Sequence, residues 1–437
     1  MYLGMPLSER CRNTCNYNGC NRLTVGVYYY PWWGKDFHQG NPNNPDRYLR
    51  EQLVDPQQLP ALGRYNDTEP DVIAKHLKWS RQYNIDLWVS SWWGEDRRED
   101  LVIKNNILTH PQLGDHKIAI FYETTGRIRE KDGDFSLENV RPDLEYLCRQ
   151  YFSHPNYYYY QTNNNNHKRP VFFVYLTRKL EQLGLLPEVI ALMRQGATDG
   201  GCNDIFIVGD HVFQGPPTIG EMAYISFDIL DGVTNYDVYG SMRGGKNGGY
   251  VGSREKVTEY YQEQQQWKDI AQNQQCSFIP CASPGFNDRG VRPEKERIPL
   301  SRKLNEDAAE GSLFQAALQE ARKLVDSSVQ NLLMVNSFNE WHEDTQIEPC
   351  VAVDGSKGKD SSTNLPNNLT YGLQYEGYDK LYLEILKDET ETWDVSSIIT
   401  PSSVSSVATP NNVDTSSSTT TEGSITTISD TIGSVVF

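Results

Sequence analysis

The sequence has no apolar run that approaches the ~20 residues of a membrane-spanning helix, and residues 1–10 lack the apolar centre of a signal peptide. Positive charge is also scarce, because 41 Lys and Arg stand against 58 Asp and Glu, which gives a formal net charge of -17. The field of such a chain repels phosphate backbones and anionic bilayers, so nucleic acid is not an expected partner. We expect a monomer that binds a neutral molecule.

Motifs of several common enzyme classes are missing as well. No GxGxxG follows a candidate strand, no GxSxG marks a serine hydrolase, and no HExxH marks a zinc peptidase. Cys11, Cys15 and Cys20 do not have a standard zinc spacing. We therefore expect no metal and no cofactor. The eight cysteines are an even number, which permits disulfides without fixing their pairs.

The two ends of the chain differ from its middle in composition. Half of the residues from Ser396 to Phe437 are Ser or Thr, and Lys and Arg are absent there, which is typical of a disordered tail. We expect a Cys-containing N-terminal segment over 1–21, one large domain over 22–393 and the disordered Ser/Thr-rich tail over 394–437. The sequons at Asn66 and Asn368 are compatible with secretion.

Short apolar runs, rich in Val, Ile, Tyr and Phe, alternate with longer stretches along the large domain. Near-continuous apolar runs of this kind predict parallel strands that are covered on both faces. The runs are residues 24–31, 85–93, 117–124, 170–177, 204–210, 232–236, 276–286 and 331–341. Eight such units are the number in a closed barrel, so we predict an α/β fold, a (β/α)8 TIM barrel over 22–393. The crossover between the fifth and sixth runs is short and poorly helical.

Helices are expected between these strands. In the first, Val72, Ile73, His76, Leu77 and Ser80 recur at helical spacing behind a start signal at residues 67–70. The predicted helices cover residues 71–83, 137–152, 183–194, 254–272, 313–326 and 375–386.

The C-terminal ends of the predicted strands carry polar and aromatic residues, and in this fold the active site lies there. The ends are residues 28–34, 90–95, 122–127, 175–178, 210–211, 235–237, 284–289 and 339–343. Sugar rings stack on aromatic faces while their hydroxyls bond to polar groups, so the pattern indicates a carbohydrate site. Any single Trp or Tyr is more often part of the core, but the convergence of so many endings favours a site.

Glycoside hydrolysis generally needs two carboxyl groups, and Glu340 and Glu343 are the best-placed pair. If the chain turns directly after Glu340, both can face the barrel mouth while Trp341 packs sideways. Two nearby carboxylates also raise the pKa of one of them, which keeps an acid protonated at neutral pH. The alternative is that one glutamate only caps the next loop or pairs with an arginine. Asn339 and His342 are expected to orient the pair.

At these residues the chain resembles glycoside hydrolase family 99, the endo-α-1,2-mannosidases and endo-α-1,2-mannanases, from about Leu23 to Leu386. The most specific piece is SFNEWHEDTQIEP at residues 337–349, which departs from the family's usual string mainly at Asp344, where glycine is common. Supporting pieces are YYPWWG at 29–34, VSSWWG at 89–94 and SPGFNDR at 283–289, followed by Arg292 and Pro293. The family fold is a (β/α)8 barrel, which agrees with the strand count.

The resemblance implies a retaining, endo-acting enzyme that cleaves α-1,2-mannosidic linkages in glucosylated high-mannose N-glycans or mannans, in the Golgi lumen or after secretion. It implies that Glu340 takes the proton of the substrate's 2-hydroxyl, which attacks its own anomeric carbon to form a 1,2-anhydro sugar. Glu343 then protonates the leaving oxygen and later activates water. The predicted substrate-binding residues are Tyr30, Trp33, Trp92, Trp93, Glu123, Arg127, Tyr175, Asp210, His211, Tyr236, Arg292, Asn339 and His342. The alternatives are a related barrel that hydrolyses or transfers another polysaccharide, and an inactive carbohydrate-binding barrel.

Overall fold

The computed structural model of the 437-residue chain describes residues 22–34, 54–55, 57–131, 134–161, 168–216, 225–242, 249–290, 292, 298–358 and 370–394. The predicted N-terminal segment over 1–21 lies outside these residues, and so do the sequon at Asn368 and all but the first residue of the predicted tail over 394–437. The described residues fall within one compact unit, Met1–Ile398.

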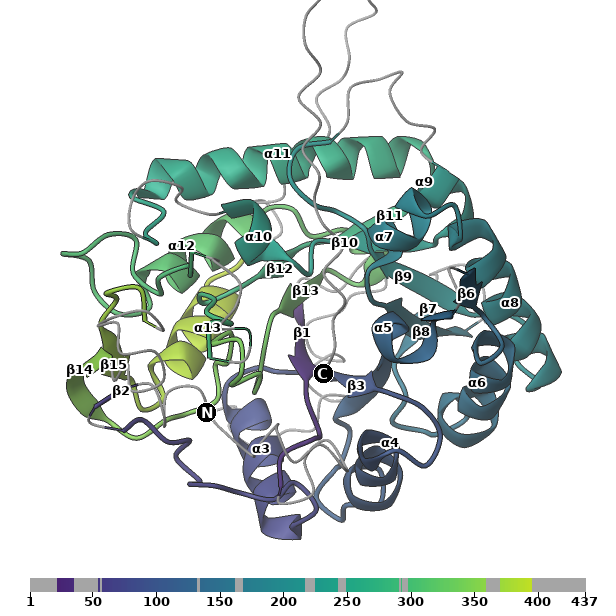
Figure 1. The fold of residues 1–437 in the computed structure, drawn as a ribbon, viewed down its shortest axis with the longest axis horizontal. Helices are drawn as coiled ribbons and strands as arrows, with labels where there is room; N and C mark the ends of the chain where they lie inside the picture. The colour runs from purple at the N-terminus through teal and green to yellow at the C-terminus, as the bar shows by residue number, and fades with distance from the viewer. Residues whose placement is uncertain are drawn as a thin grey trace, which may run out of the picture. The chain divides into compact units, whose positions relative to one another are not determined.

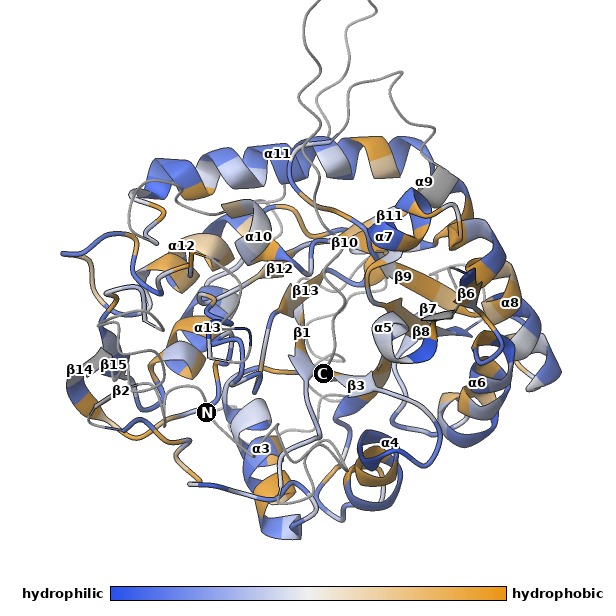
Figure 2. Cartoon of the chain, viewed as in Figure 1, coloured by the Kyte–Doolittle hydropathy of each residue, from blue (hydrophilic) through white to orange (hydrophobic). Residues whose placement is uncertain are grey.

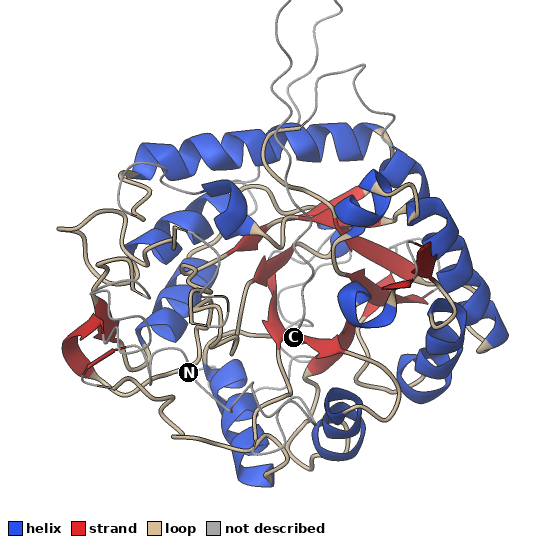
Figure 3. Ribbon diagram, viewed as in Figure 1, coloured by secondary structure: helices blue, strands red, loops and turns tan. Residues whose placement is uncertain are grey.

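Parallel strands form a barrel at the centre of this unit, with helices around it, which confirms the predicted fold class (Figures 1 and 3). The barrel strands are β1 (Thr24–Tyr29), β3 (Leu87–Trp92), β4 (Lys117–Tyr122), β8 (Lys168–Val174), β9 (Phe206–Asp210), β10 (Gly232–Thr234), β11 (Ser277–Ile279), β12 (Cys281–Ala282) and β13 (Leu332–Val335). Their order in the sheet is β11-β10-β9-β8-β4-β3-β1-β13-β12. Only Pro280 separates β11 from β12, so these two strands form one position and bring the ends of the sheet together.

Each of the eight predicted runs contains one of these barrel positions. The strands are short and almost wholly buried because each one is covered by its neighbours, by the barrel interior and by the helices outside. Figure 2 shows β9 and β13 as largely apolar, whereas α6 and α11 carry many polar residues.

The helices lie between the strands in the sequence and surround them in space (Figure 1). The longer ones are α3 (Pro70–Gln82), α6 (Val140–Leu147), α8 (Leu186–Asp199), α11 (Arg254–Asn273), α12 (Ser312–Ala321) and α13 (Leu381–Glu391). The shorter ones are α4 (Arg98–Val102), η1 (Ile103–Ile107), α5 (Thr124–Arg127), η2 (Cys148–Phe152), α7 (Thr177–Gln182), α9 (Ile225–Ile229), α10 (Val238–Met242) and η3 (Ser327–Val329). Within the part of the chain that is described, no helix is both long and apolar enough to cross a bilayer.

The predicted last helix is wrong at its start. Residues 375–377 form a strand, β15 (Tyr375–Gly377), which pairs antiparallel with β14 (Val353–Gly358), and α13 begins only at Leu381. Strand β14 also pairs with β2 (Val54–Asp55), so a small sheet lies beside the barrel (Figure 1). The remaining short strands are β5 (Arg129–Lys131), β6 (Asp134–Ser136) and β7 (Tyr159–Gln161).

Consecutive residues of a barrel strand point alternately into the barrel and toward the helices, and this alternation decides which strand-end residues reach the mouth. In β1, the Tyr28 ring packs against Phe121 with ring centroids 4.9 Å apart inside the barrel. Tyr29 points outward, where its ring stacks on Trp88 and its hydroxyl bonds to His76 of α3 at 2.9 Å.

Candidate active site at the C-terminal ends of the strands

The segment after β13 bends from Asn336 and reaches a turn at residues 341–344, with Glu340 directly before this turn and Glu343 within it. The Glu340 amide donates to Ser337 Oγ at 2.9 Å, and Glu340 Oε1 accepts from the His342 amide at 2.8 Å. The Glu343 carbonyl accepts from the Asn287 amide at 2.7 Å. These contacts hold the backbone of both residues, and the His342 amide also orients the Glu340 carboxyl group.

Both glutamates are buried, and burial raises their pKa values. The pKa of Glu340 rises to about 8 through burial, which the His342 amide and Arg292 partly oppose. The pKa of Glu343 rises to about 7 through burial, which Arg292 opposes and the charge of Glu340 reinforces. A carboxyl pair in this state holds a proton near neutral pH, as acid–base chemistry requires.

Glu123 follows β4 and brings a third carboxyl group to the same place. Its pKa rises to about 8, first through burial and then through the charges of Glu340 and Glu343, while a hydrogen bond from Ser91 opposes the rise. Ser91 Oγ donates to Glu123 Oε1 at 2.7 Å and accepts from Trp93 Nε1 at 2.9 Å. These contacts place the three glutamates and the half-buried Trp93 at one end of the barrel.

A glycine positions the Trp93 ring. A Cβ at Gly126 would lie 2.4 Å from Cε3 of Trp93, and no side chain tolerates that approach. The ring therefore rests against the backbone of α5, with the Trp32 ring centroid 6.4 Å away.

Three tyrosines form an aromatic wall beside the glutamates. The hydroxyls of Tyr30 and Tyr236 lie 2.5 Å apart, and the Tyr236 ring contacts Tyr175 with centroids at 5.4 Å. Burial raises the pKa of Tyr30, and the charges of Glu123 and Glu340 raise it further, which shows how close these groups are. The hydroxyl pair thus stays protonated and offers polar edges next to the carboxyl groups.

Arg292 brings a positive charge to the site. Its NH1 lies 2.8 Å from Glu343 Oε1 and 3.2 Å from Asp288 Oδ2. Glu343 therefore pairs with an arginine, which is the alternative that the sequence left open. It belongs to the carboxyl cluster at the same time. Because Asp288 shares the same guanidinium, Arg292 does not fully neutralise Glu343.

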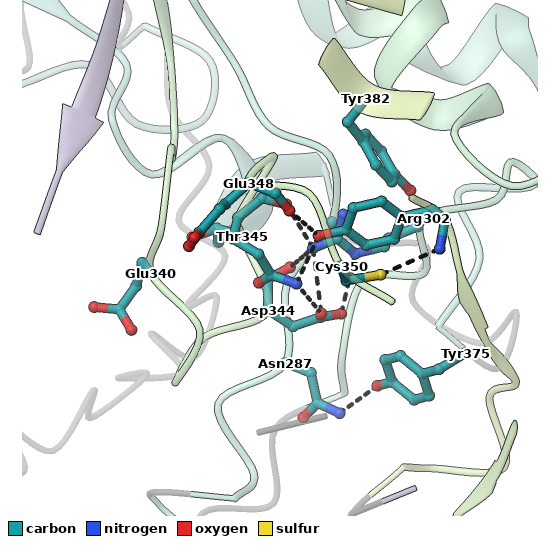
Figure 4. A network of polar contacts seen from close by, with 12 residues as sticks. Asn287, Arg302, Glu340, Asp344, Thr345, Glu348, Cys350, Tyr375 and Tyr382 are labelled. Carbon is teal, nitrogen blue, oxygen red and sulfur yellow. Dashed lines mark hydrogen bonds and ion pairs between the residues drawn. The ribbon is translucent and has the colours of Figure 1, made fainter. Parts of the chain in front are cut away.

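The opposite side of the same loop is packed by a separate polar network (Figure 4). Arg302 NH2 donates to the carbonyl oxygens of Asp344 and Gln346, each at 2.9 Å, and lies 3.2 Å from Asp344 Oδ1. Asp344 has a left-handed φ of 53°, so this ion pair holds the turn directly after Glu343. Glu348 accepts from Tyr65 at 3.0 Å and from Trp341 Nε1 at 2.7 Å.

Three predicted substrate-binding residues face the helices instead of the mouth, which corrects those expectations. Trp92 is fully buried and donates to Asp100 of α4 at 2.9 Å. Arg127 forms a two-pronged ion pair with Asp143 of α6, at 2.7 and 2.8 Å. His211 Nε2 lies 3.0 Å from Glu181 Oε2 on α7. Only Trp92 lies on a strand, at the end of β3, whereas Arg127 ends α5 and His211 follows β9.

Two further predicted residues serve the frame of the site. The Asn339 side chain accepts from the Tyr30 amide at 2.8 Å and donates to the Tyr30 carbonyl at 3.0 Å. Trp33 is fully buried and donates to the Asn339 carbonyl at 3.0 Å. These contacts join the end of β1 to the loop that carries Glu340, so Asn339 orients that loop, as the sequence indicated, while Trp33 has no exposed face for a sugar.

Asp210 and His342 complete the predicted set. Asp210 is buried and pairs with Arg178, whose NH2 also lies 2.9 Å from Asp237. This cluster braces the rim on the far side of Tyr175. The His342 ring lies against Trp33, with Nδ1 3.3 Å from Glu340 Oε1, so it contacts one of the two glutamates directly.

Ser91, Asp288 and Trp32 also lie at the site, although they are not among the site residues predicted from the sequence. Trp32 lies 4.7 Å from Tyr30 between ring centroids, and it is the member of the Trp32–Trp33 pair that approaches Trp93. Nothing in the Ser-Ser and Asn-Asp pairs that contain Ser91 and Asp288 indicated a role at the site. Among the described residues, no cluster of His, Cys, Asp and Glu has the arrangement of a metal site.

A barrel of parallel strands whose C-terminal ends gather buried, partly protonated glutamates and tyrosines defines a glycoside hydrolase. The model of the family described as glycosyl hydrolase family 99 matches residues 21–184 of the chain. The chain belongs to the family described as glycosyltransferase WbsX, whose model matches residues 136–356, about half of the chain.

Relatives and a solved structure are similar to most of the chain. The chain is 25% identical over 351 residues to glycoprotein endo-alpha-1,2-mannosidase of Mus musculus, a match that covers 74% of this chain and 67% of the relative. It is 24% identical over 346 residues to the glycoprotein endo-alpha-1,2-mannosidase-like protein of Homo sapiens, with 74% and 68% covered. A family 99 endo-alpha-mannosidase structure from Bacteroides thetaiotaomicron shares the fold at a TM-score of 0.54 and 22% identity, with 84% of this chain and 96% of that chain covered.

Proposed function

We propose that this chain is a retaining endo-α-1,2-mannosidase that acts on glucosylated high-mannose N-glycans or on mannans. One observation carries the proposal: Glu340, Glu343 and Glu123 share one buried site, where burial and mutual repulsion hold protons on carboxyl groups near neutral pH. The endo-alpha-1,2-mannosidase names of the similar proteins support the linkage, and the net negative charge of the chain is compatible with a neutral glycan.

In the proposed mechanism the substrate provides its own nucleophile. Glu340 removes the proton of the 2-hydroxyl as O2 attacks C1, and the bond from C1 to the leaving oxygen breaks while Glu343 protonates that oxygen. Water then attacks C1 of the 1,2-anhydro sugar and gives its proton to Glu343, while O2 recovers the proton from Glu340. Two displacements at C1 retain its configuration. The assignment of the base and the acid rests on the resemblance, because the interacting carboxyl groups titrate as a set.

The remaining mouth residues have proposed binding roles. Trp93 is suited to stack on a sugar ring, and Glu123 to accept from its hydroxyls. Tyr30, Tyr175 and Tyr236 bound the reacting sugar, and the ion pair with Arg292 keeps Glu343 in place.

Replacement of each glutamate by its amide tests the proposal. E340Q and E343Q are each expected to lower kcat on an α-1,2-linked mannan by about 10²- to 10⁴-fold, because a positioned acid or base contributes that much. The matched control is E384Q, at an exposed glutamate of α13, which should keep full activity. Circular dichroism checks that each variant is folded. Full activity in E340Q or E343Q would refute the assignment.

The leaving group separates the two roles. An aryl α-mannoside with an acidic phenol needs little protonation, so E343Q should lose less activity on it than on mannan, whereas E340Q should lose equally on both. Product mass and anomeric NMR of a digested glucosylated glycan report endo action and stereochemistry. Inversion at C1 would contradict the 1,2-anhydro route.

Sugar transfer is the second candidate, favoured by the match of residues 136–356 to a glycosyltransferase family. The discriminating experiment supplies an acceptor oligosaccharide in excess and compares coupled products with hydrolysis products by mass. Under the first proposal hydrolysis products predominate. Binding of the glycan without any turnover would instead identify an inactive carbohydrate-binding barrel.

Action in the secretory pathway, in the Golgi lumen or after secretion, is part of the proposal, since the substrate class named for the relatives is a glycoprotein. Release of an N-glycan from Asn66 of the chain made in its own cells would support it. An unglycosylated chain confined to the cytosol would contradict it.

A further inference from the structure

We propose that Tyr371 and Arg289 form an outer subsite, which binds a sugar residue of the leaving-group part of the substrate beyond Glu343. The inference rests on the proposed function for its ligand class, an α-mannan or high-mannose oligosaccharide. Tyr371 and Arg289 lie outside the carboxyl cluster of Glu340, Glu343 and Glu123.

Tyr371 is unusual in both exposure and backbone. Among the described residues only two large apolar side chains are exposed, Tyr371 and Leu183, each by 40%. Tyr371 also has a φ of 58° and is followed by Gly372 at 79°. A bulky residue rarely adopts the left-handed region, and such outliers are concentrated at functional sites. The turn therefore presents an aromatic ring to solvent at a cost in backbone energy.

The turn that carries Tyr371 is anchored on both sides. Thr370 is buried, and its carbonyl accepts from the Leu373 amide at 3.0 Å. Leu373 is buried too, and its Cδ1 is 3.5 Å from the position of a Cβ built on Gly249, in the segment before α11. Fixed neighbours mean that the exposed ring has a defined place and little conformational freedom to lose on binding.

Arg289 connects this ring to the active site. Its guanidinium carbon lies 5.7 Å from the Tyr371 ring centroid, within cation–π range. The Arg289 amide donates to Asn287 Oδ1 at 3.0 Å, and the Asn287 amide donates to the Glu343 carbonyl at 2.7 Å. Asn287 also bonds to the Tyr375 hydroxyl on the strand after the turn (Figure 4). A chain of contacts through Arg289 and Asn287 therefore links Tyr371 to the loop that carries Glu343.

The chemistry of the pair fits a sugar. The Arg289 guanidinium lies over the Tyr371 ring. The exposed part of the ring offers an apolar surface for the C–H face of a pyranose. The guanidinium over the ring holds the ring in place beside that surface. Since Glu343 is the proposed acid, the sugars next to it belong to the leaving group, and an endo-acting enzyme has a leaving group long enough to extend along the rim.

Y371A tests the subsite by comparing two substrates. On α-1,2-mannan oligosaccharide, Y371A is expected to raise KM about three- to tenfold with little change in kcat, because an aromatic contact that binds ground and transition states alike affects KM alone. On an aryl α-mannoside, whose leaving group is too short to reach the rim, Y371A should match the wild type. Y371F should behave as the wild type on both substrates.

L183A is the matched control, because Leu183 is equally exposed but lies at the end of α7, on the helical shell. Loss of activity on both substrates in Y371A would show a general structural effect and overturn the inference, as would no loss on either.

Binding measurements separate this inference from the proposed function. Calorimetry compares the mannan oligosaccharide on E340Q and on E340Q/Y371A, without any need for turnover. A Kd about three- to tenfold weaker in the double variant supports the subsite even if the wild type hydrolyses no mannan. Equal Kd values would overturn it whatever the catalytic result.

Discussion

The loop after β13 has two faces, and both carry buried acidic residues with different surroundings. On the mouth face, Glu340 and Glu343 are crowded by each other and by Glu123, and the cation that contacts this group is Arg292. On the packed face, Asp344 is matched to Arg302, as described above. Figure 4 shows the Glu340 side chain pointing away from that network.

Glu348, eight residues after Glu340, belongs to the packed face. Its carboxylate meets Tyr65, Trp341 and His76, the last at 3.1 Å. A buried carboxylate with so many donors is a structural centre. The comparison teaches that the partners of a buried acid, and not its burial, separate reactive groups from structural ones.

The largest expected effect is on the packed face. D344N keeps a residue that tolerates the left-handed turn but leaves the buried guanidinium of Arg302 without its charge partner. We expect a loss of roughly 3 to 5 kcal/mol in the free energy of unfolding, measured by urea denaturation. E259Q removes an exposed ion pair with Lys256 and should leave the midpoint almost unchanged. A D344N variant as stable as the wild type would show that the pair is dispensable.

The second prediction compares E340Q with E348Q, which should change the free energy of unfolding in opposite directions. The pKa of Glu340 is raised in the folded protein, to about 8, so the unfolded chain ionises first as the pH rises above 4.5 and the unfolding free energy then falls. E340Q removes this destabilisation and should be more stable than the wild type at pH 8, by an amount on the order of a few kcal/mol, with no gain below pH 4.5.

E348Q places an amide N–H where Glu348 accepts hydrogen bonds, so it should lower the unfolding free energy by roughly 1 to 3 kcal/mol. Thermal melts at pH 8 measure both variants. If the two substitutions shifted stability in the same direction, the distinction between the two faces would fail.

The smallest predicted effect concerns Arg292, the cation of the mouth face. Arg292 lowers the pKa of Glu343 and, less strongly, that of Glu340, so its removal raises both. In R292Q both limbs of the pH profile of kcat/KM should move to higher pH, by about one unit. R292K keeps the charge and should move them less. Unchanged limbs in R292Q would mean that other groups control the titration.

The sequence predicted the barrel because its strands are apolar runs separated by helix-length segments, and each run contains an observed strand. Its assignment of Glu340 and Glu343 as the catalytic pair stays a prediction. It erred at Trp92, Arg127 and His211, since a strand end of mixed polar and aromatic residues does not reveal which of two neighbours points inward. The predicted start of α13 was wrong because residues 375–377 pair with β14, Val353–Gly358, which helical periodicity does not reveal.

Local chemistry in the sequence was therefore sufficient to specify the strands and the order of the barrel, because apolar periodicity and turn residues act over a few positions. The tertiary structure alone decided that Ser91 bonds to Glu123, that Arg302 holds Asp344, and that Trp32 approaches Trp93. Charge, burial and pKa depend on which side chains meet through space, and residues more than two hundred positions apart, such as Glu123 and Glu340, meet only once the barrel has closed.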